Sequence, residues 1–206
     1  MIEISREDGL WTLTLARPDK ANALTREMLG ALETAVARAA AEGARALVLT
    51  GQGQVFSAGA DFDEVQAGLS RDPVWERLSV AIAALPCLTV AALNGTLAGG
   101  AMGMALACDL RLAVPEARFF YPVMRLGHLP QPSDPRRLAA IVGPSRARMI
   151  LMAGARIGAD EALAWGLVDR VVPVEDLLPA ARALAADSLG AAPAHVAAIK
   201  ALLPPL

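Results

Sequence analysis

Apolar residues alternate with small or polar ones over 11–16, near the start of the chain (WTLTLA). A period of two is typical of a strand with one buried face, and we expect this strand to end before the Arg-Pro pair that follows. Apolar residues then recur at helical spacing over 28–36, with Thr25 as the expected N-cap and Gly43 as the closing residue. A short apolar run over 44–51 predicts the next strand. The order strand, helix, strand is typical of a parallel sheet with helical crossovers.

The same order continues further along the chain. The sequence predicts additional strands over 87–92, 109–114 and 168–172. It predicts additional helices over 72–84, 100–108, 145–153, 160–165, 179–187 and 193–203. No internal repeat, linker or low-complexity stretch divides the sequence. We therefore expect an α/β fold in a single domain over residues 1–206.

Composition and charge narrow the range of partners. The net charge is −2 and the basic residues are scattered, whereas a nucleic-acid-binding protein gathers them on one surface. The most apolar stretch, residues 80–110, is interrupted by Pro86, Asn94, Gly95 and Asp109. It is therefore expected to hold a buried strand, a turn and a helix rather than a membrane span. We expect neither a nucleic-acid partner nor a membrane partner.

The cysteines and the first residues bear on the cellular compartment. Cys87 and Cys108 have no second cysteine or histidine at metal-ligand spacing, so we expect two buried free thiols. The opening residues, MIEISREDGLW, lack the apolar core of a signal peptide. Both observations favour a cytoplasmic protein.

Side chains suited to catalysis are few. His195 lies in an Ala-rich helical stretch and is interpreted as a packing or surface residue, whereas His128 lies in the Pro-rich loop LGHLPQPSD, a setting where ligands often bind. A Ser-His-Asp hydrolase is disfavoured because Ser57 has no G-x-S-x-G context, and no phosphate-binding loop is present. The acidic residues within 61–64 are typical of a helix start, although carboxylates so grouped also bind hard cations.

Two short stretches offer backbone amides that no large side chain covers. They are residues 58–60 (AGA), after the strand at 44–51, and residues 98–101 (AGGA), after the strand at 87–92. The second stretch begins a helix, whose first N–H groups have no partner within it. Two such amides converging on one carbonyl oxygen would form an oxyanion hole. The alternative is that the glycines only permit tight turns.

Longer blocks of sequence carry a resemblance to a known family. In chain order they are ARPDKANALTREMLGALETAV, LVLTGQGQVFSAGADFDEV, AALNGTLAGGAMGMALACDLRLA, ARFFYPVMRLGHLPQPSDPRRL and ARIGADEALAWGLVDRVVP. Together they resemble the crotonase, or enoyl-CoA hydratase/isomerase, superfamily over residues 1 to about 200. The resemblance implies a crotonase-like spiral of ββα units with C-terminal helices. It also implies a core over about 1–190 and a shortened C-terminal helical region over about 191–206.

The resemblance further implies an acyl-CoA enzyme, with coenzyme A as part of the substrate and with no covalently bound cofactor and no metal. The backbone N–H groups of Ala58 and Gly100 would hold the thioester oxygen and stabilise its enolate. The residues implied to bind coenzyme A are Lys20, Ala21, Ala23, Ala60, Asp61 and Phe62. The implied assembly is a homotrimer or hexamer, and the implied setting is fatty acid metabolism.

The sequence departs from the family pattern at the acid/base positions. Family hydratases carry one glutamate after the glycine-rich turn and another after the A-x-F stretch, and these positions here hold Gly103 and Val123. Neither residue transfers a proton. Gln131 stands where other members have an aspartate. Isomerase, decarboxylase or thioester hydrolase chemistry is therefore as open as the hydration performed by a lyase.

Several groups could replace the missing glutamates. Our candidates are His128 and Gln131, with Tyr121 and Asp134 in or beside the same loop and Asp61 or Glu64 on the opposite wall of the site. The alternative is a catalytically inactive paralogue that binds acyl-CoA or a protein.

Overall fold

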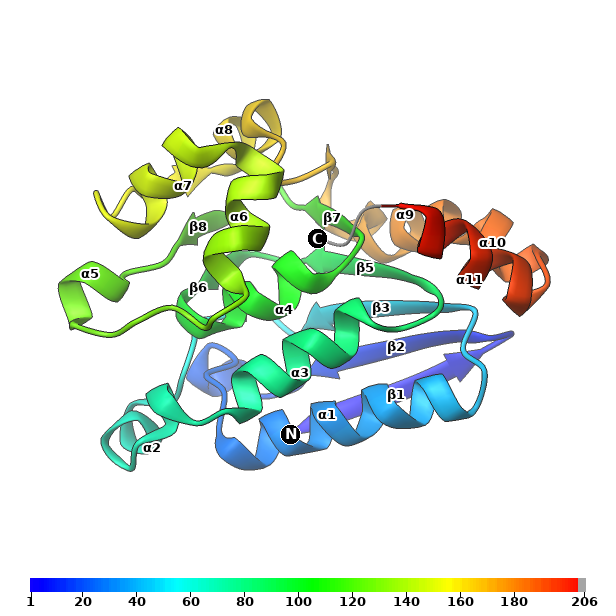
Figure 1. The fold of residues 1–206 in the computed structure, drawn as a ribbon, viewed down its shortest axis with the longest axis horizontal. Helices are drawn as coiled ribbons and strands as arrows, with labels where there is room; N and C mark the ends of the chain where they lie inside the picture. Colours follow the sequence, from blue (N-terminus) through cyan, green and yellow to red (C-terminus); the bar gives the residue numbers. More distant parts are fainter. Residues whose placement is uncertain (204–206) are drawn as a thin grey trace.

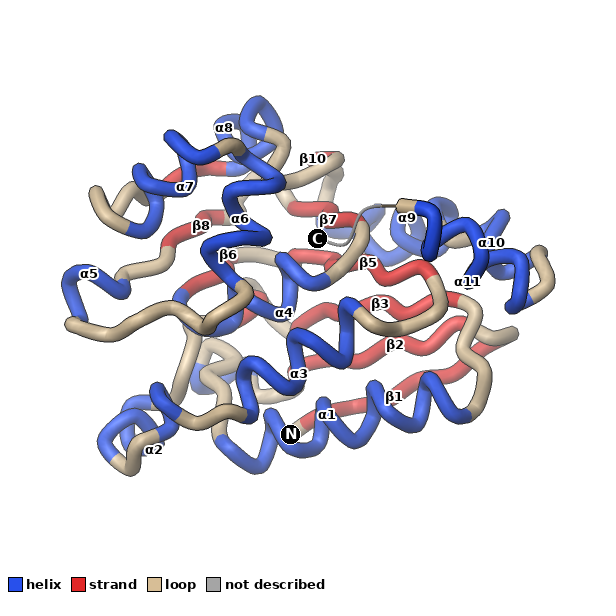
Figure 2. Tube along the Cα trace, viewed as in Figure 1, coloured by secondary structure: helices blue, strands red, loops and turns tan. Residues whose placement is uncertain are grey.

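Two β-sheets form the framework of residues 1–203, the part of the chain that the computed structural model describes (Figures 1 and 2). The larger sheet has the strand order β1-β2-β3-β5-β7-β10. Its strands are β1 (Ile2–Glu7), β2 (Leu10–Leu15), β3 (Ala46–Gly51), β5 (Leu88–Leu93), β7 (Leu110–Ala113) and β10 (Arg170–Val171). Only β1 is antiparallel to its neighbour. The carboxyl ends of the parallel strands therefore meet at one edge of the sheet.

The smaller sheet has the order β4-β6-β8-β9. Its strands are β4 (Val55–Ser57), β6 (Thr96–Ala98), β8 (Arg118–Phe120) and β9 (Ile157–Gly158). The chain passes from the larger sheet to the smaller one three times, from β3 to β4, from β5 to β6 and from β7 to β8. A helix follows each time: α2 (Phe62–Gln66), α4 (Met102–Ala107) and α5 (Val123–Leu126). This repetition confirms the predicted spiral of ββα units.

The remaining helices cover the sheets. Figure 1 shows α1 (Arg26–Ala41) and α3 (Val74–Ala83) side by side across one face of the larger sheet. The later helices are α6 (Asp134–Val142), α7 (Pro144–Leu151), α8 (Ala159–Trp165), α9 (Leu177–Leu184), α10 (Ala186–Gly190) and α11 (Pro193–Leu202). Short 3₁₀ turns are η1 (Pro18–Lys20), η2 (Leu69–Arg71), η3 (Gly99–Ala101) and η4 (Val174–Asp176). The predicted C-terminal helical region, about 191–206, thus contains α11, and its last three residues lie outside the described part.

The elements with strong periodicity agree with prediction. The alternating stretch near the start is β2, and the first helical stretch is α1. Thr25 caps this helix as predicted, because its Oγ1 accepts a hydrogen bond from the Met28 N–H at 3.1 Å. The structure adds strands that the pattern did not predict, namely β1 and all of the smaller sheet, and it adds the helices α5 and α6.

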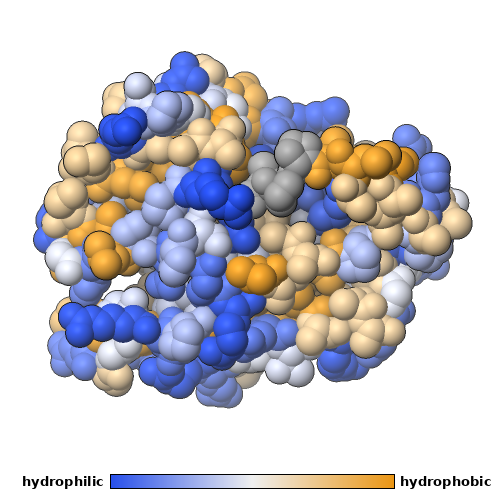
Figure 3. Space-filling view, viewed as in Figure 1, coloured by the Kyte–Doolittle hydropathy of each residue, from blue (hydrophilic) through white to orange (hydrophobic). Residues whose placement is uncertain are grey.

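The two cysteines are buried free thiols, as expected. Burial raises the pKa of Cys87 to about 11 and that of Cys108 to about 12, so both stay protonated near neutral pH. Within residues 1–203, no helix combines the length and the apolar character needed to cross a membrane. Hydrophobic side chains remain exposed on and just after α11, at Ile199, Leu202 and Leu203, and Figure 3 shows hydrophobic surface in this region.

The turn between β5 and β6 joins the two sheets closely. A Cβ atom added to Gly95 would lie 1.9 Å from the carbonyl oxygen of Gln54, which is backbone just before β4. The Asn94 side chain in the same turn donates to the Gly53 carbonyl oxygen at 2.8 Å. Only glycine therefore fits where the chain leaves the larger sheet for the smaller one.

Gly95→Ala is expected to lower the free energy of unfolding by about 2 kcal/mol or more, because the added methyl group meets backbone that cannot move aside. The matched control is Gly30→Ala in α1, where a Cβ has open space around it. This control should raise stability by about 0.5–1 kcal/mol through helix propensity. Urea unfolding followed by circular dichroism measures both. Equal stability of the two variants would contradict the role given to the turn.

Candidate active site

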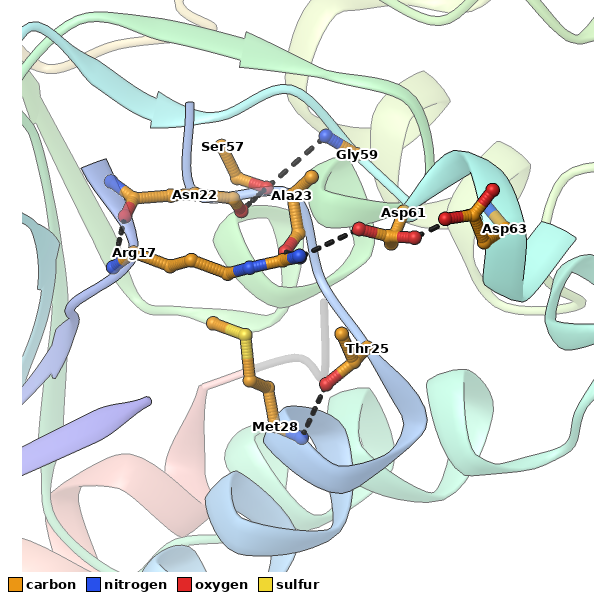
Figure 4. Close-up of polar contacts among 9 residues, drawn as sticks. All are labelled: Arg17, Asn22, Ala23, Thr25, Met28, Ser57, Gly59, Asp61 and Asp63. Atoms are coloured by element: carbon orange, nitrogen blue, oxygen red, sulfur yellow. Dashed lines mark hydrogen bonds and ion pairs between the residues drawn. The ribbon is translucent and has the colours of Figure 1, made fainter. Parts of the chain in front are cut away.

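A buried asparagine holds the loop after β2 against the start of β4 (Figure 4). The Asn22 side chain has no exposed surface. Its Oδ1 accepts from the Arg17 N–H at 2.8 Å, and its Nδ2 donates to the carbonyl oxygens of Gln52 at 2.9 Å and Val55 at 2.7 Å. Asn22 has a left-handed φ of 51°, which asparagine tolerates better than most residues. The loop over 17–24 is therefore fixed to the turn between β3 and β4.

Ser57 reinforces this connection and has no free hydroxyl. Its Oγ donates to the Asn22 carbonyl oxygen at 2.8 Å and accepts from the Gly59 N–H at 3.1 Å, in a fully buried position (Figure 4). Both contacts are to backbone. The hydroxyl thus serves the local fold, in agreement with the sequence analysis, which disfavoured a serine nucleophile.

The backbone after β4 pairs with the loop in a way that leaves one amide unused. The Ala58 N–H donates to the Ala21 carbonyl oxygen at 2.9 Å, so the structure contradicts the prediction that this amide is available to a substrate. Leu24 pairs with the next residues, accepting from the Asp61 N–H at 2.9 Å and donating to the Gly59 carbonyl oxygen at 2.8 Å. Among the described residues, no acceptor takes the Ala60 N–H. The available donor lies two residues after the predicted one.

The two glycine-rich turns lie against each other. A Cβ on Gly59 would be 3.1 Å from the Ala98 carbonyl oxygen and 3.5 Å from the Gly99 Cα, so the backbones touch. Both glycines have positive φ, 99° and 59°. Gly100 is the second residue of η3, and the first N–H groups of a helix have no acceptor within it. The two turns are thus in contact, and convergence of their amides on one oxygen stays a prediction.

Trp75 fixes the position of the second turn. Its ring would be 3.3 Å from a Cβ on Gly100, and its Nε1 donates to the Leu69 carbonyl oxygen at 2.9 Å. The ring is buried, since only 3% of Trp75 is exposed. It packs directly on the Gly100 backbone, and a side chain at position 100 would need the ring to shift by a few tenths of an ångström.

Asp61 is occupied by structural contacts. Its Oδ2 accepts from Arg17 Nη1 at 2.7 Å, and its Oδ1 accepts from the Asp63 N–H at 3.1 Å, which caps α2 (Figure 4). The hydrogen bond from Arg17 holds the pKa of Asp61 below its ordinary value. The acidic stretch over 61–64 is therefore a helix start, the first of the two interpretations above.

Comparison with known proteins identifies the family. The family model described as enoyl-CoA hydratase/isomerase matches residues 5–204. The chain belongs to the enoyl-CoA hydratase/isomerase family. A probable enoyl-CoA hydratase of Mycobacterium leprae is 34% identical over 207 residues, covering 98% of this chain and 82% of that protein. A 4-chlorobenzoyl coenzyme A dehalogenase of an Arthrobacter species is 35% identical over 205 residues, covering 95% of this chain and 74% of that protein.

Solved structures agree with this assignment. The crystal structure of an enoyl-CoA hydratase/isomerase from Pseudoalteromonas atlantica matches with a TM-score of 0.90 at 33% identity, covering 98% of this chain and 81% of that one. The enoyl-CoA hydratase from Bacillus anthracis matches with a TM-score of 0.89 at 30% identity, covering 97% and 80%. The predicted crotonase fold is therefore confirmed.

The residues predicted to bind coenzyme A in this family member surround the paired loops. Lys20 ends η1, and Ala21 and Ala23 lie in the loop whose carbonyl oxygens accept from Ala58 and Arg17. Phe62 begins α2 and is 73% exposed, which is unusual for a phenylalanine. Binding of coenzyme A by these residues stays a prediction.

The predicted acid/base candidates lie in the loop between α5 and α6. His128 is half-buried, and within residues 1–203 its side chain has no hydrogen bond or ion pair. Gln131 is also half-buried, and its carbonyl oxygen accepts from the Asp134 N–H at 3.0 Å. A proton-transfer role for His128, and a positioning role for Gln131, stay predictions.

Asp134 has the most unusual environment of the acidic residues. It begins α6, and only 1% of it is exposed. Its Oδ2 accepts from the Tyr121 hydroxyl at 2.9 Å, whereas its Oδ1 is buried with no hydrogen-bond partner among the described residues. Burial, more than any neighbouring group, raises the pKa of Asp134 to about 7. A carboxyl group with such a pKa exchanges protons readily near neutral pH.

The same carboxyl group lies against Gly103 in α4. A Cβ on Gly103 would be 2.7 Å from Asp134 Oδ1 and 3.2 Å from Oδ2. Asp134 thus occupies the space into which any side chain at position 103 would project. Asp134 is one of the candidates predicted near this loop, although nothing in the local sequence indicates that α6 places it beside α4.

Gly103→Ala is expected to lower the free energy of unfolding by about 1–3 kcal/mol, because the methyl group would overlap a buried carboxyl group. In an Asp134→Ala background the same substitution should be neutral or stabilising, since alanine favours helix. Urea unfolding of the two single variants and the double variant gives the coupling. Additive effects would contradict the direct contact.

Proposed function

We propose that this chain binds an acyl-CoA thioester and holds the thioester oxygen between the N–H groups of Ala60 and Gly100. The observation that carries the proposal is the contact between the two glycine-rich turns, which brings together backbone donors that the fold leaves unused. Fixed donors aimed at an oxygen that gains negative charge are worth about 3–4 kcal/mol each in other oxyanion holes. The bound thioester would thereby form its enolate more readily.

Coenzyme A would run along the loop over 17–24 and the start of α2. Lys20 supplies a cation for the phosphates, and Phe62 supplies an exposed ring for stacking on the adenine. Ala21, Ala23 and Ala60 keep the path open because their side chains are small. Asp61 contributes indirectly, by its ion pair with Arg17 and its cap of α2.

The reaction class follows from the acid/base positions. The places expected for two glutamates hold Gly103 and Val123, so we propose a reaction that passes through the enolate without two-glutamate hydration. Isomerisation and decarboxylation meet this condition. Thioester hydrolysis is also open, but it would pass through a tetrahedral intermediate whose oxyanion the same amides would hold. The same two residues support the second candidate, a paralogue that binds acyl-CoA without turnover.

Comparison of butyryl-CoA with its thioether analogue, S-butyl-CoA, tests the oxygen-binding amides. The thioether lacks the carbonyl oxygen and keeps the rest of the ligand. Two hydrogen bonds at about 1 kcal/mol each predict that the thioester binds about 30-fold more tightly in calorimetry. Equal affinity would contradict the proposed role of the amides, and no binding of either ligand would contradict acyl-CoA binding.

A variant pair assigns the donor. Ala60→Pro removes the N–H and should reduce the preference for the thioester about fivefold, which corresponds to one hydrogen bond. Ala60→Gly keeps the N–H and serves as the matched control, with the preference unchanged. Mass spectrometry of enoyl-, β-keto- and malonyl-type thioesters after incubation then separates an enzyme from a binding protein. Binding without any product favours the second candidate.

Assembly as a homotrimer or hexamer and a cytoplasmic location stay predictions. The exposed apolar residues of α11 are consistent with burial between subunits. Light scattering on the purified protein measures the assembly directly.

A further inference from the structure

We propose that Asp134 is the catalytic acid/base of this chain and acts from α6 into the space beside Gly103. The inference rests on the proposed function, since it needs an acyl-CoA whose oxygen lies at the Gly100 amide. It selects Asp134 from the earlier candidates, in place of His128 and Gln131.

The position of the carboxyl group supports this role. Gly103 follows Gly100 by three residues, and positions three apart lie on the same side of a helix, about 4.5 Å apart along the axis. Oδ1 lies 2.7 Å from the place of a Cβ on Gly103. A carbonyl oxygen would sit about 2.9 Å from the Gly100 nitrogen. The proposal requires its α-carbon to lie on the side of the helix that Gly103 and Oδ1 share. A proton on that carbon is then within reach of the carboxylate.

The contacts of the carboxyl group leave one oxygen for this task. Tyr121 donates to Oδ2 and fixes the orientation of the group, whereas Oδ1 has no hydrogen-bond partner within the described residues. A buried polar atom without a partner costs stability, so its retention calls for an explanation. Because Oδ1 is buried in the free chain, contact with an acyl group requires a small opening of the packing around it.

The titratable groups around Asp134 come from three elements. Tyr121 follows β8, Arg137 lies one turn further along α6, and Glu76 lies on α3. Arg137 favours the carboxylate, and Glu76 disfavours it. Glu76 is itself bonded to Ser133, accepting from its N–H at 3.2 Å and from its hydroxyl. Burial outweighs these neighbours, so the group is poised between its two protonation states near neutral pH.

The proton-transfer step is balanced without a further reactant. The Asp134 carboxylate takes a proton from the carbon next to the thioester, so a C–H bond breaks and an O–H bond forms. The electron pair of the C–H bond moves into the enolate, whose oxygen is held by Ala60 and Gly100. In the reverse direction the carboxylic acid returns a proton to the same carbon or to a conjugated one. The first outcome is exchange with solvent, and the second is isomerisation.

The test is hydrogen exchange at the α-carbon of phenylacetyl-CoA and butyryl-CoA in D₂O, followed by mass spectrometry, with binding measured in parallel by calorimetry. Asp134→Asn keeps the shape of the side chain and should bind both thioesters within about threefold of the wild-type affinity. It should lose exchange by at least 100-fold, within the range for loss of a general base. The matched control is Asp109→Asn, which removes a carboxylate bonded to Lys200 and Thr89 at the amino ends of the strands. Its exchange rate should equal the wild-type rate.

The pH dependence adds a readout that a structural role would not change. Exchange by the wild type should rise about tenfold per pH unit below pH 7 and level off above it, since only the carboxylate accepts a proton. Tyr121→Phe removes a hydrogen bond to the charged form, so this limb should move to higher pH. If the rise of the exchange rate with pH occurs at the same pH in Tyr121→Phe as in the wild type, the proposed hydrogen bond from Tyr121 to the carboxylate has no role in exchange.

Stability provides an independent check of the buried carboxyl group. Its pKa is raised on folding, so its contribution to stability is fully present below the unfolded pKa of about 3.9 and is lost as pH rises toward 7. Asp134→Asn should therefore gain stability relative to the wild type between pH 4 and pH 8. The absence of this gain would contradict the proposed environment of the group.

The outcomes separate the two proposals. Wild-type exchange together with its loss in Asp134→Asn supports both. Exchange at the wild-type rate in Asp134→Asn, or tight binding by the wild type without exchange, would overturn the role of Asp134 and leave acyl-CoA binding standing. Failure of the wild type to bind any thioester would overturn the proposed function itself.

Discussion

The side-chain amide of Asn22 is the contact on which the geometry of the candidate site depends. It bonds three backbone groups, one in the loop after β2, one in the turn between β3 and β4 and one in the first residue of β4. With the loop fixed at this distance, Leu24 pairs with the residues on either side of Ala60, and the Ala60 N–H keeps no acceptor among the described residues. Asn22 is fully buried, so water does not replace its side-chain amide. The availability of the Ala60 N–H therefore depends on the side chain of Asn22, which lies 38 positions earlier in the sequence.

The sequence predicted the parts of the fold that have a period of their own. Strand β2 alternates and α1 has a helical stripe with a capping threonine, so each could be recognised alone. The smaller sheet could not be recognised in this way. Its strands have two or three residues, too few for a period, and they are strands only because neighbouring backbone lies at hydrogen-bonding distance. The resemblance to the family supplied the ββα spiral that the local pattern lacked.

The two turns of the candidate site could be predicted from their small residues, whereas the features that depend on distant packing could not. The two glycine-rich turns are visible in the sequence, and the structure brings them into contact. Which amide stays free is not visible, since Ala58 and Ala60 are chemically alike and differ only in the partners that the loop over 17–24 offers them. Asp134 illustrates the same limit, because its burial against Gly103 follows from how α6 packs on α4. No short sequence window contains that information.

Gly103 and Asp134 are separated by 31 positions in the numbering, from 103 to 134, yet they fill one volume. A family alignment compares columns, and the column that contains Gly103 holds no acid in this chain. The space beside that residue does contain one, carried by a different helix. Under the proposal for Asp134, this volume receives its carboxyl group from α6 instead of from α4. A comparison of the groups that share a volume, rather than of single sequence positions, therefore finds a carboxyl group that the position of Gly103 alone does not reveal.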